Sequence, residues 1–123
     1  MREIKFRGKQ TKPIESIWHY GDLIHSKDNK TYIQNITCME VDKETVGQFT
    51  GLRDKNGVEI YEGDIVKDAW GINMVVRYIN TAFYLCRKNI NGEYSKVSNW
   101  RNLNTKEIIG NIHDNPELLK ESD

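Results

Sequence analysis

Apolar and polar residues alternate along several short stretches of the chain, and this period of two predicts β-strands. Residues 2–7 place Ile4 and Phe6 on one face and charged side chains on the other, as in a strand that is buried on one side. Runs rich in isoleucine, valine and aromatic residues predict further strands at 17–24, 31–33, 58–61, 65–67, 74–79, 82–87 and 107–113. Such short, closely spaced strands indicate a meander or a small barrel.

The strongest local signal is the segment 53–57, which separates two runs of alternating residues. Asn56 and Gly57 allow the positive φ angles that a tight hairpin requires. We expect Gly57→Val to lower the free energy of unfolding by about 1 kcal/mol or more, because a β-branched residue is strained at positive φ. Replacement of Asp54 is expected to cost less, since its side chain would serve only local hydrogen bonds.

Turn-forming residues divide the chain between these strands. Residues 8–13 end the first strand, and Gly21 and Asp22 indicate a bulge or a tight bend in the second. The charged residues 41–46 indicate a loop or one helical turn. Residues 114–119 combine a capping residue, a proline and an acidic side chain, which predicts a short helical turn near the end of the sequence.

Composition favours an all-β domain. Isoleucine and valine together number 21, against 8 for leucine and alanine, and this balance excludes a helical bundle. A length of 123 residues suits one core. We expect a single domain over residues 1–123, with an N-terminal β segment at 1–46, a barrel-like segment at 47–114 and a helical turn and tail at 115–123.

Charge is balanced overall but not locally. The 18 basic and 18 acidic side chains cancel, which excludes a molecule whose whole surface attracts nucleic acid or an anionic membrane. Residues 1–12, however, hold five cations against Glu3 alone. Two interpretations stay open for this tract and the aromatic residues near it: a solvated strand face with rings packed in the core, or a contact surface. The candidate contacts for nucleic acid or a partner protein are Arg2, Lys5, Arg7, Trp18 and Tyr20.

Motifs for catalysis and cofactor binding are absent from the sequence. The nine glycines form neither a dinucleotide-binding nor a phosphate-binding loop. The acidic residues at 59, 62 and 64 are better explained by turn formation than by acid–base chemistry. His19, His25 and His113 could in principle hold zinc, but no spacing brings them together. We therefore expect no enzyme activity, no cofactor and no metal.

The ends and the cysteines predict a cytoplasmic protein. Residues 1–10 lack the apolar run of a secretory signal, and no stretch approaches the length of a membrane span, so we expect no contact with a membrane. Cys38 and Cys86 lie far apart without a second cysteine nearby, which indicates two reduced thiols.

Four stretches of the chain resemble the YopX family, small proteins of bacteriophages and prophages. The longest is residues 46–66, VGQFTGLRDKNGVEIYEGDIV. The others are MREIKFR at 1–7, WHYGDLI at 18–24 and IIGNIHDNPELL at 108–119. The chain departs from the family pattern over residues 68–104, and glycine and lysine stand at positions 8 and 9, where the family usually has tryptophan.

The resemblance implies a β-rich fold with a small barrel in the second half, and a bacterial cytoplasm during phage carriage. It implies no biochemical activity. The step from Gly63 to Val66 also resembles the strand opening of many Src-homology-3-like barrels, so we expect the N-terminal strands and hairpin to pack with such a barrel. The family motif is interpreted as a structural turn formed by Gly51, Asp54, Asn56, Gly57, Tyr61, Glu62, Gly63 and Asp64.

Two function classes follow from these observations. The first is a non-enzymatic, self-associating β-rich adaptor that binds itself or a host or phage protein through a sheet edge or exposed aromatic residues. The alternative is a nucleic-acid-associated phage regulator that uses the basic strand near the N-terminus.

Overall fold

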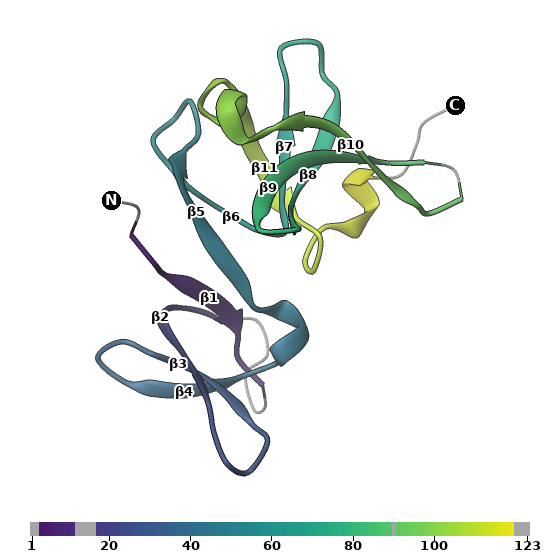
Figure 1. Ribbon diagram of the computed structural model, residues 1–123. Coiled ribbons are helices and arrows are strands. Elements are labelled where there is room, and N and C mark those ends of the chain that lie inside the picture. The colour runs from purple at the N-terminus through teal and green to yellow at the C-terminus, as the bar shows by residue number, and fades with distance from the viewer. Residues whose placement is uncertain (1–2, 12–16, 90, 120–123) are drawn as a thin grey trace. The chain divides into compact units, whose positions relative to one another are not determined.

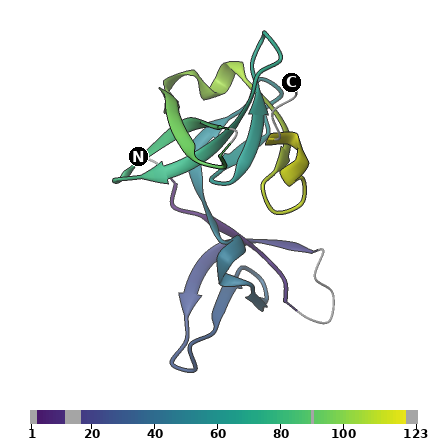
Figure 2. The same ribbon diagram turned by 90° about the vertical axis from the view of Figure 1, so that its right-hand side faces the viewer.

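The computed structural model describes residues 3–11, 17–89 and 91–119 of the chain. These residues form two compact units, Met1–Phe49 and Thr50–Asp123. The first unit runs from purple to blue in Figure 1, and Figure 2 gives a second view of both units. The elements are β1 (Phe6–Lys9), β2 (Trp18–His25), β3 (Thr31–Gln34), β4 (Cys38–Val41), η1 (Lys43–Thr45), β5 (Gly47–Arg53), β6 (Glu59–Tyr61), β7 (Asp64–Lys67), β8 (Asn73–Ile79), β9 (Ala82–Lys88), β10 (Tyr94–Asn99), η2 (Trp100–Thr105), β11 (Glu107–Asn111) and η3 (Pro116–Leu119), where η marks a 3₁₀ helix.

The first unit is an antiparallel sheet whose strand order is β4-β3-β2-β1-β5. The sheet curls until β4 meets the end of β1, because Gln10 forms a β-bridge with Val41 and the amide of Asp42 donates to the carbonyl of Lys9 at 2.8 Å. Val41 and Ile33 are buried in this unit. Closure of the curled sheet therefore gives these few strands a small core.

The first strand differs from its prediction. It was expected at residues 2–7 with Ile4 inside and Arg7 outside, and this is wrong: the strand runs over Phe6–Lys9, Ile4 is 69% exposed and Arg7 is 6% exposed. The expected break at Gly8 is also wrong, because Gly8 lies within the strand. A Cβ atom on Gly8 would lie 2.7 Å from Cγ2 of Val41, so the packing of the two strands requires glycine there.

The predicted strands at 17–24 and 31–33 are confirmed, and they form a hairpin. No bulge occurs at Gly21 and Asp22, where one was expected. Gly21 pairs with Phe6 and Asp22 pairs with Gln34 within one continuous strand. The charged segment after β4 contains the 3₁₀ turn η1. Asp42 caps this turn, because its side-chain oxygen accepts from the backbone N–H of Glu44.

The second unit contains an antiparallel sheet of strand order β10-β9-β8-β7-β11. Strands β7 to β10 form a meander, and β11 returns beside β7. Strand β5 continues into this unit, where it pairs with β6. Among the described residues every strand pair is antiparallel and the helical segments are 3₁₀ turns, so the predicted all-β class is confirmed. Closure of the sheet into a Src-homology-3-like barrel stays a prediction.

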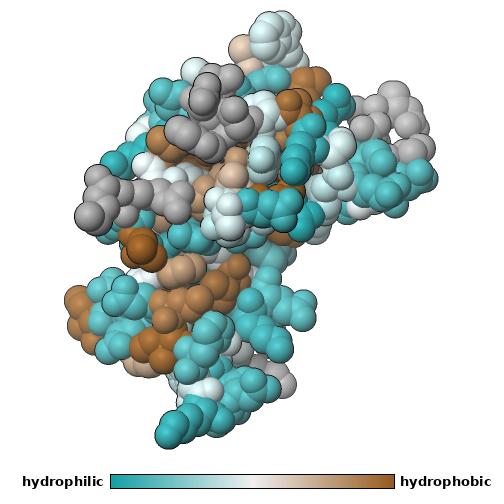
Figure 3. Space-filling view, in the orientation of Figure 1, coloured by the Kyte–Doolittle hydropathy of each residue, from teal (hydrophilic) through white to brown (hydrophobic). Residues whose placement is uncertain are grey.

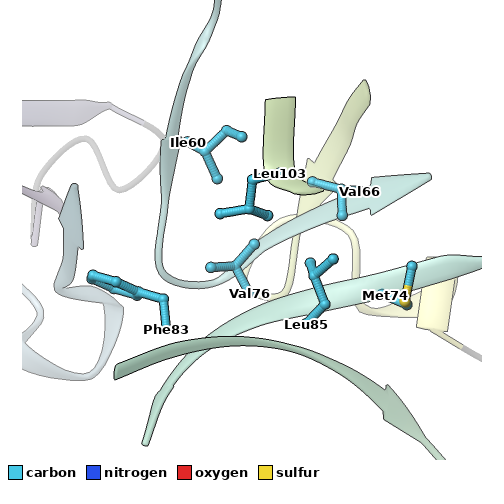
Figure 4. Close-up of a cluster of buried hydrophobic side chains, with 7 residues drawn as sticks. All are labelled: Ile60, Val66, Met74, Val76, Phe83, Leu85 and Leu103. Carbon is cyan, nitrogen blue, oxygen red and sulfur yellow. The ribbon is translucent and has the colours of Figure 1, made fainter. Parts of the chain in front are cut away.

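The five-stranded sheet carries apolar side chains on both faces. The larger cluster, shown in Figure 4, is fully buried. It consists of Ile60, Val66, Met74, Val76, Phe83, Leu85 and Leu103. On the opposite face Ile65, Val75 and Cys86 are buried together with Leu119 of η3. The terminal helical turn predicted at 114–119 is therefore confirmed, and its leucine covers the second face of the sheet.

Four hairpin turns share one hydrogen-bond pattern, in which the first residue of the turn bonds twice through its backbone. In the turn after β5, the carbonyl of Asp54 accepts from the N–H of Gly57, which has a positive φ, and the N–H of Asp54 donates to the carbonyl of Val58. The same pattern starts at Ser26, Asp68 and Asn89. This is the three-residue hairpin loop that closes with a left-handed residue, so the predicted hairpin at 53–57 is confirmed.

Three elements were not predicted from the sequence. The first is β4, which pairs with β3. The others are β10, which pairs with β9 through a bulge between Lys96 and Ser98, and the 3₁₀ segment η2. The last predicted strand is two residues shorter than expected, ending at Asn111 and not at His113.

Gly57 has a φ of 82°, whereas Asn56 does not adopt a positive φ. A Cβ atom on Gly57 would meet nothing within 4 Å, so the cost of a side chain is backbone strain alone. We expect Gly57→Val to lower the free energy of unfolding by about 1 kcal/mol in urea titrations. Gly57→Asn should cost less, because Asn29 occupies the equivalent position of the β2–β3 turn at a φ of 66°. Equal losses for the two variants would contradict this account.

Candidate functional site

Three of the four glycines of the long motif at 46–66 adopt backbone conformations that other residues rarely adopt. Gly51, Gly57 and Gly63 have φ angles of 88°, 82° and 94°. Gly63 also donates its N–H to the carbonyl of Val76 and accepts from the N–H of Ile112, both within 2.9 Å. The glycines thus shape the backbone of the second unit.

Asp54 is buried and connects two distant parts of the second unit. Its Oδ1 accepts from the amides of Asn56 and Val58 at 2.8 and 3.0 Å, and its Oδ2 accepts from the amide of Ile108 at 3.0 Å. The bond to Ile108 spans 54 positions of the sequence. The expectation that Asp54 serves only local hydrogen bonds is therefore wrong.

Hydrogen bonding also decides the ionisation of Asp54. Burial favours the neutral acid, but the amides of Ile108, Val58 and Asn56, with Lys55 nearby, outweigh it and leave the pKa of the Asp54 carboxyl below its ordinary value. The Asp54 carboxylate is consequently an anion with a structural role, and its oxygens accept hydrogen bonds from three backbone amides.

The remaining polar residues of the motif also bond within the fold. Asp64 is buried and its Oδ2 accepts from the amide of Tyr61 at 2.7 Å. The Tyr61 hydroxyl, on a side chain only 1% exposed, donates to Glu59 at 3.1 Å. Glu62 is half-buried and Asn56 is exposed. The bonds of Asp64, Tyr61 and Glu59 thus hold the structural turns of the motif together.

The sequence-predicted contact residues of the first unit come together on one face of β1 and β2. Tyr20 pairs directly with Arg7, and Lys9 pairs with Trp18. The Arg7 guanidinium carbon lies 4.8 Å from the centre of the Trp18 ring, within cation–π range. Strand alternation puts Asp22 on the same side as Trp18 and Tyr20. The Tyr20 face is defined by Arg7, Lys9, Trp18, Tyr20 and Asp22.

Exposure differs within the Tyr20 face. Tyr20 is 43% exposed and Trp18 is half-buried, whereas Arg7 is 6% exposed. The buried Arg7 guanidinium therefore packs against the Trp18 ring and is not presented to a ligand. Lys5 lies 5.2 Å from the centre of the Phe49 ring and 3.9 Å from the carboxylate of Glu3. Arg2, the remaining predicted contact, lies outside the described residues. Figure 3 shows apolar and polar side chains side by side on the surface of the first unit.

A second group of cations and rings lies on β8, β9 and β10, and the sequence did not predict it. The Arg77 guanidinium carbon is 4.3 Å and the Lys88 nitrogen 5.9 Å from the centre of the Tyr94 ring. The Lys96 nitrogen is 4.5 Å from the centre of the Tyr84 ring. The Tyr94 face is defined by Arg77, Tyr84, Lys88, Tyr94 and Lys96.

Cys86 lies beneath the Tyr94 face. Burial raises the pKa of its thiol, and the positive charges of Arg77 and Lys96 offset part of that rise. Strand pairing agrees, since Cys86 pairs with Lys96 on one side and with Val75 on the other. Two cations thus flank a buried thiol on this side of the sheet.

The three histidines were considered as zinc ligands. His19 Nε2 lies 2.7 Å from the side-chain oxygen of Gln10, so this ring is part of a hydrogen bond within the first unit. Within residues 3–11, 17–89 and 91–119, no group of three or more His, Cys, Asp or Glu side chains is arranged to hold a metal ion. In the same residues, no helix has the length and apolar character needed to cross a bilayer.

The family model described as YopX protein matches residues 5–120, which is nearly the whole chain. No curated protein shows significant similarity to the chain.

Proposed function

This chain belongs to the YopX family, and on that premise we propose that it is a non-enzymatic, self-associating interaction protein of a phage or prophage. It acts in the cytoplasm of the bacterial host as an adaptor. The Tyr20 face of one copy binds the Tyr20 face of a second copy, and the dimer then presents its second units to a host or phage protein.

The long motif supports a structural role in place of catalysis. Its glycines shape turns, and Asp54 and Asp64 accept backbone amides. A general acid or base needs a carboxyl group that can reach a substrate proton. Both carboxylates are buried and bonded within the fold.

The sheet edges favour association through a face. Strand β4 is bridged to Gln10, β6 has three residues, and β10 and β11 contain register shifts. Bulged, short or covered edges resist strand addition from another chain. Of the two contact modes expected from the sequence, exposed aromatic residues are thus favoured over a sheet edge.

The single observation that carries the proposal is the convergence of Trp18, Tyr20 and Arg7 on one face. These are the residue types that dominate binding energy at protein interfaces. Because Arg7 holds the Trp18 ring in place, little side-chain entropy remains to be lost on binding.

The charges on this face suit a second copy of the chain. Lys9 lies on β1, whereas Asp22 lies on β2 and is exposed. In a two-fold symmetric dimer the same patch meets itself in reverse, so the cation of one copy approaches the carboxylate of the other.

Sedimentation velocity over a series of concentrations tests the proposal. The wild-type chain should sediment with twice its 14.4 kDa mass at high concentration. Tyr20→Lys should weaken the dimer by about thirtyfold, equivalent to about 2 kcal/mol for an interface hot spot.

Tyr78→Lys is the matched control, because Tyr78 is a tyrosine on a strand of the second unit with a similar exposure of 39%. It should leave the dimer intact, with folding of both variants checked by circular dichroism. A wild-type chain that stays monomeric at every concentration, or equal losses for the two variants, would contradict the proposal.

The cations of the N-terminal strand support nucleic-acid binding less well than they support a protein partner. Of these cations, Arg7 is buried against Trp18 and Lys5 lies beside Glu3. Phosphate binding needs accessible cations that replace the counterions condensed on the nucleic acid. The described part of this strand therefore favours a protein partner.

A further inference from the structure

The Tyr94 face is assembled by strand register from three neighbouring strands. Arg77 of β8 pairs directly with Tyr84 of β9, and Lys88 of β9 pairs with Tyr94 of β10. Lys96 pairs with Cys86, two positions along β9 from Tyr84. Direct cross-strand partners project to the same side of a sheet. One sheet face therefore brings three cations and two aromatic rings together around Cys86.

The rings have one side packed and one side accompanied by cations. Tyr84 and Tyr94 pack against the buried cluster of Ile65, Val75 and Cys86, and both remain half-buried. Their positions are set by the core, so the rings themselves need not move to accept a ligand. A base stacks on a ring once the flexible cation over it turns toward a phosphate.

The Tyr94 face carries three cations, Arg77, Lys88 and Lys96. Within the part of the chain that the structure describes, neither Arg77, Lys88 nor Lys96 forms an ion pair with a carboxylate. Lys96 is exposed, and Lys88 and Arg77 are half-buried. Three positive charges therefore accompany two rings, a combination suited to a ligand with regularly spaced anions and planar groups.

We propose that the Tyr94 face binds single-stranded nucleic acid, with bases stacking on Tyr84, Tyr94 and the Arg77 guanidinium and with phosphates contacting Lys88 and Lys96. Proteins that bind single strands without sequence preference combine cations along the backbone with aromatic platforms for the bases. A duplex offers phosphates but keeps its bases stacked inside, so it satisfies only half of this surface. This site is separate from the Tyr20 face and does not depend on self-association.

Fluorescence anisotropy with labelled oligothymidylate and oligouridylate at low salt tests the proposal on the full chain. Both single strands should bind, and a DNA duplex of the same length should bind more weakly. Tyr94→Leu, which keeps an apolar side chain over the buried cluster, should weaken single-strand binding by about tenfold. Lys96→Gln should lower the slope of log affinity against log salt by about 0.7, as for one phosphate contact on a single strand.

Lys43→Gln is the charge-matched control, since Lys43 is exposed on η1 in the first unit, and it should change nothing. Lys5→Gln tests whether the basic N-terminal strand binds the nucleic acid in place of the Tyr94 face.

Loss of binding in Lys5→Gln with no loss in Tyr94→Leu would overturn the Tyr94 face as the binding site in favour of that strand. Absence of single-strand binding at low salt would also overturn the proposal. So would competition by polyglutamate as strong as that by an unlabelled oligonucleotide, because an acidic protein would then suffice as the partner. None of these outcomes bears on whether Tyr20→Lys dissociates the dimer.

Discussion

Asp54→Ala is expected to lower the free energy of unfolding by about 3 kcal/mol, and Asp54→Asn by about 2 kcal/mol, in urea titrations. Alanine leaves three backbone amides without the buried carboxylate that they now share. Asparagine keeps one oxygen for the turn, but its amide nitrogen would face the N–H of Ile108, so two donors would meet. The loss in Asp54→Asn therefore reports the long-range bond to Ile108, and the further loss in Asp54→Ala reports the turn bonds.

The turn that starts at Asn89 shows that an amide is sufficient for the turn itself. Asn89 Oδ1 accepts from the amides of Asn91 and Glu93, the same two positions that Asp54 Oδ1 serves in its own turn. Among the residues that the structure describes, Asp68 accepts only the two turn amides, those of Trp70 and Ile72. Asp68→Asn is therefore the matched control and should be nearly neutral. A loss as large as that of Asp54→Asn would contradict the role assigned to the bond with Ile108.

The effect of Asp54 should depend on pH. Because the pKa of its carboxyl is lowered in the folded state, its stabilisation is fully present above the unfolded pKa of about 3.9 and is lost as the pH falls through the lower folded pKa. The stability difference between wild type and Asp54→Asn should thus be largest near neutral pH and shrink in acid. A difference that grows as the pH falls would contradict the lowered pKa.

Gly21→Ala is the second substitution with a large expected effect, about 3 kcal/mol or more. A Cβ atom on Gly21 would lie 2.2 Å from the carbonyl oxygen and 2.9 Å from the carbonyl carbon of Gln34. Both atoms are backbone, so only separation of β2 from β3 relieves the collision. Gly21 also has a φ of 157°, which adds strain to any side chain.

Hydrogen exchange gives the local test of this variant. The amides of β2 and β3 should lose protection in Gly21→Ala. Gly92→Ala is the control, because Gly92 has a φ of 82° while its Cβ would meet only Lys88 Cε at 3.8 Å. It should cost about 1 kcal/mol from backbone strain alone. Equal losses in the two variants would mean that the collision with Gln34 is unimportant.

Alternation and short apolar runs were sufficient to predict most strands, because strands such as β3 bury alternate residues, whereas β7 and β8 bury consecutive ones. Alternation failed at residues 2–7, where Ile4 and Phe6 suggested a buried side. The strand begins later because Phe6 and Arg7 pair with both β2 and β5, and because Gly8 packs on Val41. These partners are distant in sequence, so local alternation could not reveal them.

Strand β10 could not be predicted from alternation, since Ser95, Lys96 and Val97 are all exposed on an edge strand. A signal did exist at Asn89 and Gly92, which repeat the spacing of Asp54 and Gly57. An Asx residue three positions before a glycine satisfies two amides of the same hairpin loop. That spacing indicates a hairpin and hence a strand after it.

The two candidate faces differ in how far the sequence predicted them. Arg7, Trp18 and Tyr20 were grouped because aromatic residues lie close to a basic tract, and one hairpin brings them together. The residues of the Tyr94 face come from three strands within the region of no firm motif. Their proximity follows from the register of β8 with β9 and of β9 with β10, which composition does not determine.

The central claim is that the Tyr20 face joins two copies of the chain. The most direct measurement is an isotope-filtered NOE spectrum of a sample that mixes labelled and unlabelled full-length chain. The account predicts intermolecular contacts from the rings of Trp18 and Tyr20 to residues of β1 and β2 in the other copy. A spectrum without intermolecular contacts, or with contacts only from β8 to β10, would contradict it.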